Sequence, residues 1–174
     1  ARTGTNLKMK LVINGAGGKM GRMITEMAKN ENHEIAALVD VMFENENYKK
    51  LEDFTGSADC VIDFSNHKAA EGLVNYCVSK NFPVLIASTG HDEKELNLIR
   101  EAAKKIPVFM SPNMSVGVAL VADIAERVTK IFGDCDIEII EAHHNQKLDV
   151  PSGTALMLAK RIQEVKEESN FNIG

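Results

Sequence analysis

The sequence has little of what marks a secreted, membrane-spanning or nucleic-acid-binding protein. Tryptophan is absent, aromatic residues make up 5%, and the 174 residues include only three cysteines and four prolines. No apolar run approaches the roughly 18–20 residues that cross a bilayer, so we expect no membrane partner. Lysine and arginine are scattered and the net charge is −5, which argues against the basic face of a nucleic-acid-binding protein.

The cysteines indicate the compartment. Cys60, Cys77 and Cys135 are far apart and form no C-x-x-C pair. Such an odd, unpatterned set is typical of reduced thiols in a cytosolic protein rather than of disulfides or a zinc site. We therefore expect a cytoplasmic, globular protein. The polar residues 1–8 lack the apolar core of a signal peptide, and we expect them to be an addition from cloning that precedes a natural start at Met9.

Most of the chain alternates between short apolar runs rich in β-branched residues and longer stretches of helical periodicity. This alternation requires crossover connections, and hence a parallel sheet covered by helices on both faces. We predict an α/β fold, a Rossmann-like doubly wound parallel sheet, over residues 9–115. The expected strands are Lys10–Asn14, Ile35–Val39, Cys60–Phe64, Pro83–Ala87 and Pro107–Met110.

The pattern changes at Val116. A helix is followed by an expected strand at Ile137–Ala142 and by a second helix that starts near Ser152. One strand and two helices cannot close a layer by themselves. We therefore predict that residues 116–174 form a smaller, incomplete α+β substrate domain.

A glycine-rich turn, G-A-G-G-K-M-G, lies where the first strand should pass into the first helix. A dinucleotide pyrophosphate needs close backbone approach and gains from the free N–H groups of a helix N-terminus. Asp40, at the end of the second strand, can accept hydrogen bonds from the ribose hydroxyls. The predicted cofactor-binding residues here are Gly15, Ala16, Gly17, Gly18, Lys19, Met20 and Asp40.

The residue at position 40 also bears on the choice of cofactor. A 2′-phosphate needs a neighbouring cation, and an aspartate repels it. Val41 and Met42 follow Asp40 and supply no positive charge. We predict NADH as the preferred cofactor, with NADPH as the alternative.

Further loops leave the carboxyl ends of the predicted strands, where ligands bind in open parallel sheets. Their small and hydrogen-bonding residues suit a nicotinamide carboxamide. The candidates in these loops are Ala87, Ser88, Thr89, Ser111, Pro112, Asn113 and Met114.

The segment from Glu138 to Ala155 combines E-A-H-H-N-Q-K with P-S-G-T-A. Histidine and lysine are natural proton donors for a reduction that leaves negative charge on its substrate, here His143 and Lys147. Ser152, Gly153 and Thr154 open a helix, and such an N-terminus suits a carboxylate. His143 and the adjacent His144 would point to opposite faces of a strand, so we expect no metal site.

This segment resembles the signature of the dihydrodipicolinate reductases, and G-A-G-G-K-M-G-R, V-I-D-F-S, S-T-G and N-M-S-V-G-V resemble the family's other landmarks. The resemblance implies NAD(P)H-dependent reduction of 4-hydroxy-tetrahydrodipicolinate to tetrahydrodipicolinate in lysine biosynthesis, with loss of water, by a homotetramer. It implies a catalytic His143, a proton-donating Lys147, and substrate-binding roles for His144, Gly153 and Thr154, with Thr89 near both ligands.

Two other functions stay open at this point. Another two-domain dehydrogenase of amino or keto acids would use the same glycine turn, although the histidine and P-S-G-T-A segment would then be unexplained. A non-catalytic nucleotide-binding fragment or sensor would retain only the cofactor site.

Overall fold

A computed structural model describes residues 7–43, 47–111, 113–143, 145, 151–167, 169–170 and 172. The chain divides into two compact units, Ala1–Ser111 and Pro112–Gly174. Each unit is a separate body with its own elements. No helix in the described ranges is both long and apolar enough to span a membrane.

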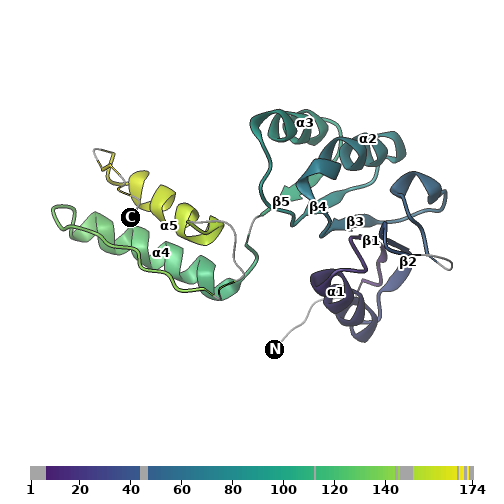
Figure 1. Cartoon of the computed structure of the whole chain (residues 1–174), viewed down its shortest axis with the longest axis horizontal. Coiled ribbons are helices and arrows are strands. Elements are labelled where there is room, and N and C mark those ends of the chain that lie inside the picture. Colours follow the sequence, from purple (N-terminus) through teal and green to yellow (C-terminus); the bar gives the residue numbers. More distant parts are fainter. Residues whose placement is uncertain are drawn as a thin grey trace. The chain divides into compact units, whose positions relative to one another are not determined.

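The first unit contains a five-stranded sheet of order β2-β1-β3-β4-β5 in which every neighbouring pair is parallel (Figure 1). The predicted parallel sheet is therefore confirmed. Its buried strands read as continuous apolar runs because helices cover a parallel sheet. The strands are β1 (Lys10–Asn14), β2 (Glu34–Val39), β3 (Cys60–Asp63), β4 (Val84–Ile86) and β5 (Val108–Met110).

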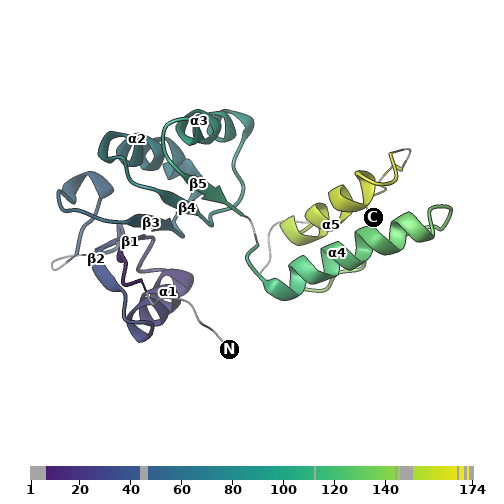
Figure 2. The same cartoon turned by 180° about the vertical axis from the view of Figure 1, so that it is seen from behind.

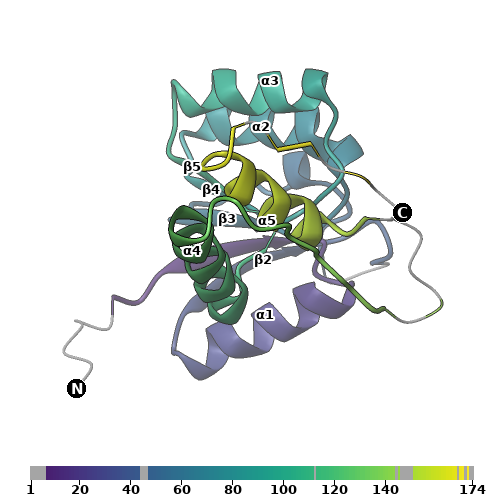
Figure 3. The ribbon, with the colours of Figure 1, turned by 90° about the vertical axis from the view of Figure 1, so that its left-hand side faces the viewer.

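Helices lie on both faces of this sheet, with α1 on one side and α2 and α3 together on the other (Figures 1 and 3). The helices are α1 (Lys19–Asn30), α2 (Ala70–Lys80) and α3 (Glu93–Ala103), with short 3₁₀ turns at Leu51–Asp53 and His67–Ala69. Asp92 and Glu95, which are three residues apart, form the capping box that starts α3.

Two hydrophobic clusters hold the layers together. The larger lies on the α2 and α3 side and includes the fully buried Val12, Val61 and Cys77. The smaller packs Leu11 and Ile13 of β1 against α1. Burial raises the pKa of the Cys77 thiol to about 12, so this cysteine is an apolar core residue rather than a reactive one.

The helices in the described part of the second unit are α4 (Val116–Ile131) and α5 (Gly153–Gln163), which pack against each other (Figures 1 and 2). Glu126 of α4 links the two helices, because its carboxylate contacts Arg161 of α5 at 3.3 Å, and it also contacts Lys130 of its own helix at 2.7 Å. The hydrogen bond from Lys130 is the main reason that the pKa of Glu126 is lowered.

The predicted strand at Ile137–Ala142 is wrong for this structure. Residues 136–143 carry no strand, and the side chains of Ile137 and Ile140 are exposed by 42% and 88%. A strand forms only when a neighbouring strand satisfies its N–H and C=O groups. The described part of the second unit is otherwise helical, so this apolar segment has no strand beside it there.

Candidate functional site

The glycine turn connects β1 to α1, and two of its glycines are required by close backbone contacts. Gly15 has a φ of +78°, and a Cβ at this position would lie 2.6 Å from the Phe64 carbonyl group. A Cβ on Gly21 would lie 2.1 Å from the Gly15 carbonyl oxygen. No other residue type fits these two positions without moving backbone.

The start of α1 is left open by this arrangement. The N–H groups of Gly15 and Ala16 both donate to the Val39 carbonyl oxygen, at 2.9 and 3.1 Å, which anchors the turn to the end of β2. Gly18 is the N-cap residue and offers no side chain to cap the helix. The turn therefore fits the requirement of a pyrophosphate for helix N–H groups and unobstructed backbone.

Asp40 follows β2 and lies beside the turn, as the sequence predicted. Its Oδ2 accepts a hydrogen bond from the Gly17 N–H at 2.9 Å, and its Oδ1 accepts one from the Met42 N–H at 2.9 Å. The two bonds fix the orientation of the carboxylate. Each carboxylate oxygen keeps a second lone pair that a ribose hydroxyl could use.

A buried carboxylate joins three strands at their carboxyl ends. Asp63, which is 1% exposed, accepts hydrogen bonds from the Asn14 amide at 2.7 Å, the Ser65 hydroxyl at 2.6 Å and the Ser88 hydroxyl at 2.9 Å. Sequence reasoning missed this role of Asp63. The available signal was an acidic residue within the apolar run C-V-I-D-F, because a buried carboxylate must find donors.

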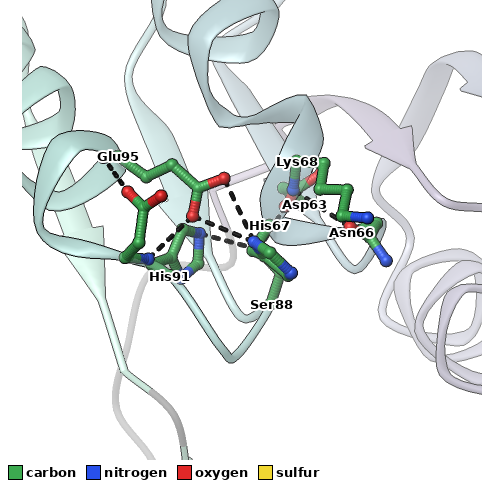
Figure 4. A network of polar contacts seen from close by, with 8 residues as sticks. Asp63, Asn66, His67, Lys68, Ser88, His91 and Glu95 are labelled. Atoms are coloured by element: carbon green, nitrogen blue, oxygen red, sulfur yellow. Dashed lines mark hydrogen bonds and ion pairs between the residues drawn. The ribbon is translucent and has the colours of Figure 1, made fainter.

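Two histidines and a glutamate support the loop that contains Ser88 (Figure 4). The His67 Nδ1 lies 2.9 Å from the Glu95 carboxylate, and the His91 Nε2 lies 3.4 Å from the Ser88 hydroxyl. The hydrogen bond from the Asp92 backbone, followed by the contact with His67, lowers the pKa of Glu95. Gly90 has a φ of +89°, and a Cβ at this position would lie 3.5 Å from the His67 ring. The contact between His91 and Ser88 and the contact between His67 and Glu95 therefore restrain this loop.

Most of the residues that we predicted to bind the cofactor in the loops after β4 and β5 are described by the structure. Ala87, Ser88 and Thr89 follow β4, with Ser88 buried and Thr89 exposed. Ser111 follows β5 in the first unit, whereas Asn113 and Met114 belong to the second unit. Pro112 lies outside the described residues.

Within the second unit, the start of α5 gathers several of the remaining candidates. Ser152 is the N-cap residue, and its hydroxyl accepts a hydrogen bond from the Ala155 N–H at 3.1 Å. The Asn113 amide donates to the Thr154 hydroxyl at 2.9 Å, and a Cβ added to Gly153 would meet no atom within 4 Å. The N-terminus of α5 thus offers N–H groups beside open space.

His143 is described, and its Nδ1 lies 3.7 Å from the carboxylate of Glu141. Glu141 in turn contacts Ser152, a role that sequence reasoning also missed. His144 and Lys147 lie outside the described residues. Among the residues that are described, no group of three His, Cys, Asp or Glu side chains could hold a metal ion.

A parallel sheet with a glycine turn after β1 and an aspartate after β2 defines a Rossmann-type α/β protein. More narrowly, the chain belongs to the dihydrodipicolinate reductase family. The family model described as "Dihydrodipicolinate reductase, N-terminus" matches residues 9–114, and the one described as "Dihydrodipicolinate reductase, C-terminus" matches residues 117–174.

Individual relatives agree with this family. The chain is 42% identical to the 4-hydroxy-tetrahydrodipicolinate reductase of Clostridium tetani, over 97% of this chain and 69% of that protein. It is also 42% identical to the enzyme of the same name from Caldanaerobacter subterraneus subsp. tengcongensis, over 93% of this chain and 66% of that protein.

Among solved structures, the dipicolinate-bound dihydrodipicolinate reductase from Paenisporosarcina sp. TG-14 matches with a TM-score of 0.76 and 28% identity. This match covers 95% of the present chain and 69% of the other. The chain thus spans about two thirds of the length of these relatives.

Proposed function

We propose that the protein catalyses the NAD(P)H-dependent reduction of 4-hydroxy-tetrahydrodipicolinate to tetrahydrodipicolinate in lysine and diaminopimelate biosynthesis. One observation carries the proposal: Asp40 is hydrogen-bonded to an open glycine turn in a chain whose relatives are named 4-hydroxy-tetrahydrodipicolinate reductase. The turn supports a dinucleotide, and the name of the relatives supports the substrate.

The assay follows directly from this reaction. The substrate is formed in the cuvette from pyruvate and aspartate semialdehyde by an added enzyme that condenses the two, and the protein should then oxidise NADH, seen as a loss of nicotinamide absorbance. A panel of other amino and keto acids serves as the control. Binding of NADH without turnover of any substrate would contradict the proposal and would favour a non-catalytic nucleotide-binding protein.

Different residues would bind the cofactor and the substrate. A reduced nicotinamide supplies the hydride when it is bound. Gly15, Gly17 and Asp40 would hold the dinucleotide, and the Ser88–Thr89 loop, which the buried Asp63 carboxylate fixes, would orient its nicotinamide end.

On the substrate side, the N–H groups of Gly153 and Thr154, next to the N-cap residue Ser152 at the start of α5, would bind a carboxylate of the dicarboxylate substrate. The relative from Paenisporosarcina binds dipicolinate, a small aromatic dicarboxylate, which supports this assignment. We assign a second carboxylate contact to His144 and Lys147, and the proton that completes the reduction to His143 or Lys147.

Replacing Lys147 with alanine tests the proton donor. Loss of a general acid typically lowers turnover by about 10²- to 10⁴-fold. We expect kcat of the Lys147→Ala protein to fall within that range, while the Kd for NADH stays close to the wild-type value, because the cofactor residues are untouched. Full activity in this variant would end the assignment.

Asp40 supports a preference for NADH. Its carboxylate lies beside the glycine turn, where a 2′-phosphate would meet a like charge, and such pairs cost several kcal/mol. We expect kcat/KM to be about tenfold or more higher with NADH than with NADPH, since 1.4 kcal/mol corresponds to tenfold. Asp40→Asn should reduce that ratio, and an unchanged ratio would contradict the role of the charge.

The assembly and the compartment complete the proposal. We infer a homotetramer in the cytoplasm, with no nucleic acid or membrane as partner. The exposed apolar side chains on α4, including Leu120, Ile124 and Ile131, support an interface between copies. Light scattering coupled to gel filtration measures the mass, and a monomer at micromolar concentration would contradict the assembly.

A further inference from the structure

One carboxylate in the second unit contacts both the start of α5 and a predicted catalytic histidine. The two oxygens of Glu141 accept hydrogen bonds from Ser152, one from the backbone N–H at 2.7 Å and one from the hydroxyl. The same hydroxyl accepts from the Ala155 N–H at 3.1 Å. Glu141, which lies eleven residues earlier in the chain, is therefore linked by hydrogen bonds to the N-cap residue of α5.

Glu141 also lies close to His143, which is two residues further along in a segment that forms neither a helix nor a strand. The Nδ1 of His143 lies 3.7 Å from Oε2 of Glu141. This distance is too long for a hydrogen bond, so the contact is electrostatic.

Electrostatics favours one form of the neutral imidazole ring at this position. An unprotonated Nδ1 would direct its lone pair toward a negative oxygen, whereas an Nδ1–H directs a positive hydrogen toward it. The carboxylate therefore favours the tautomer in which Nδ1 carries the proton. The Nε2 atom is then the nitrogen that can exchange a proton with a ligand, and the His143 side chain is 39% exposed.

We propose that Glu141 is a positioning residue that fixes the tautomer of His143 and, through Ser152, its location relative to the N-terminus of α5. One side chain, that of Glu141, would then position both the N-terminus of α5, which we propose to bind a carboxylate, and the ring of His143, which we propose to donate a proton. The effect on turnover rests on the proposed function, whereas the tautomer does not.

The first test measures the tautomer and requires no activity. Long-range ¹H–¹⁵N spectra of the full chain at about pH 8.5, where histidine rings are generally neutral, distinguish Nδ1–H from Nε2–H, and a His143→Gln spectrum assigns the signal. We expect His143 to be mainly Nδ1–H in the wild type. In Glu141→Gln, the amide can donate to Nδ1 instead, and the Nδ1–H population should fall at least twofold.

The second test separates positioning from simple stabilisation by kinetics. Partners that orient metal-binding histidines change affinity or activity by about 10- to 100-fold when removed. We expect Glu141→Gln to lower kcat by about 10-fold and to change KM less than threefold, and Glu141→Asp to recover part of kcat. Glu164→Gln, at the exposed far end of α5, is the matched control and should retain wild-type kcat.

The outcomes separate this inference from the proposed function. A Glu141→Gln protein with a lower Tm but an unchanged His143 tautomer would make Glu141 a helix cap only and would overturn the proposal. A wild-type chain without turnover would contradict the proposed function, while the spectra would still decide the role of Glu141. Ser152→Ala, which keeps the charge beside His143, should weaken α5 and leave the tautomer unchanged.

Discussion

Asp63 is a single buried charge whose neighbours are all arranged around it. Its carboxylate accepts from three side chains that come from the ends of β1 and from the loops after β3 and β4. A buried donor that loses its acceptor costs about 1–3 kcal/mol. The side chain therefore joins the carboxyl ends of β1, β3 and β4 as well as stabilising the unit.

We expect Asp63→Ala to lower the free energy of unfolding by about 3 kcal/mol or more, because the buried Asn14 and Ser88 and the partly buried Ser65 would lose the acceptor that they share. Urea denaturation followed by circular dichroism measures this loss. Asp53→Ala, at an exposed position in the same unit, is the control. A loss below about 1 kcal/mol for Asp63→Ala would mean that water or a rearranged loop replaces the carboxylate.

Glu95 makes stability depend on pH in a defined direction. Its pKa is lowered in the folded protein, by the hydrogen bond from the Asp92 backbone and then by His67. The unfolded chain therefore takes up this proton at higher pH than the folded chain does. The stabilising contribution is present above the unfolded pKa of about 4.3 and is lost as pH falls through the lower, folded value.

Urea midpoints at about pH 7 and pH 3.5 test this dependence. We expect acidification to lower the urea midpoint of the wild type more than that of Glu95→Gln, because glutamine cannot take up the proton. Glu101→Gln, on the same helix, retains Glu95 and should behave as the wild type. Equal losses in the wild type and in Glu95→Gln would remove Glu95 from the acid response.

At the scale of elements, close backbone contacts constrain the β1–α1 connection. Gly21 lies within the first turn of α1, and any side chain there would collide with the backbone of Gly15. Gly72 in α2 is different, because a Cβ there would meet only the Glu52 side chain, at 3.6 Å. The two positions form a matched pair of helical glycines.

We expect Gly21→Ala to destabilise the protein by about 1–3 kcal/mol, as overpacking does, and to weaken NADH binding. Gly72→Ala should be neutral or stabilising by up to about 1 kcal/mol, since alanine favours the helix. Thermal unfolding and NADH titration of the two variants make the comparison. A Gly21→Ala protein as stable as Gly72→Ala would show that α1 can move away from the turn at little cost.

Local sequence patterns predict most of these elements but not the contacts between distant parts of the chain. The five strands, the helices between them and the capping box at Asp92 follow from apolar period and local signals in the sequence. The Asp63 contacts do not, because they depend on the register that pairs Asn14 with Asp63 across β1 and β3. Ile137–Ala142 has the composition of a strand, yet a strand also needs a neighbour, which local composition does not report.

At the scale of the whole molecule, the division at Ser111 separates the glycine turn and Asp40 from Glu141, His143 and α5. The first unit has its own sheet and both hydrophobic clusters described above. We therefore expect a fragment of residues 1–111 to fold and to bind NADH within about tenfold of the affinity of the whole chain. Isothermal titration of both proteins measures this, and a fragment that is unfolded by circular dichroism would contradict it.

The hydrogen bond between Gly17 and Asp40 has a consequence for the speed and selectivity of nucleotide capture. Because the fold itself orients the carboxylate, the proposed binding of an adenosine ribose would not have to immobilise that side chain, and the entropy of ordering it would not oppose association. Backbone N–H groups already occupy two of the four lone pairs of the Asp40 carboxylate. The two remaining lone pairs can accept hydrogen bonds from two adjacent hydroxyl groups, such as those of a ribose. The carboxylate orientation that we propose for ribose binding is thus already fixed by the fold.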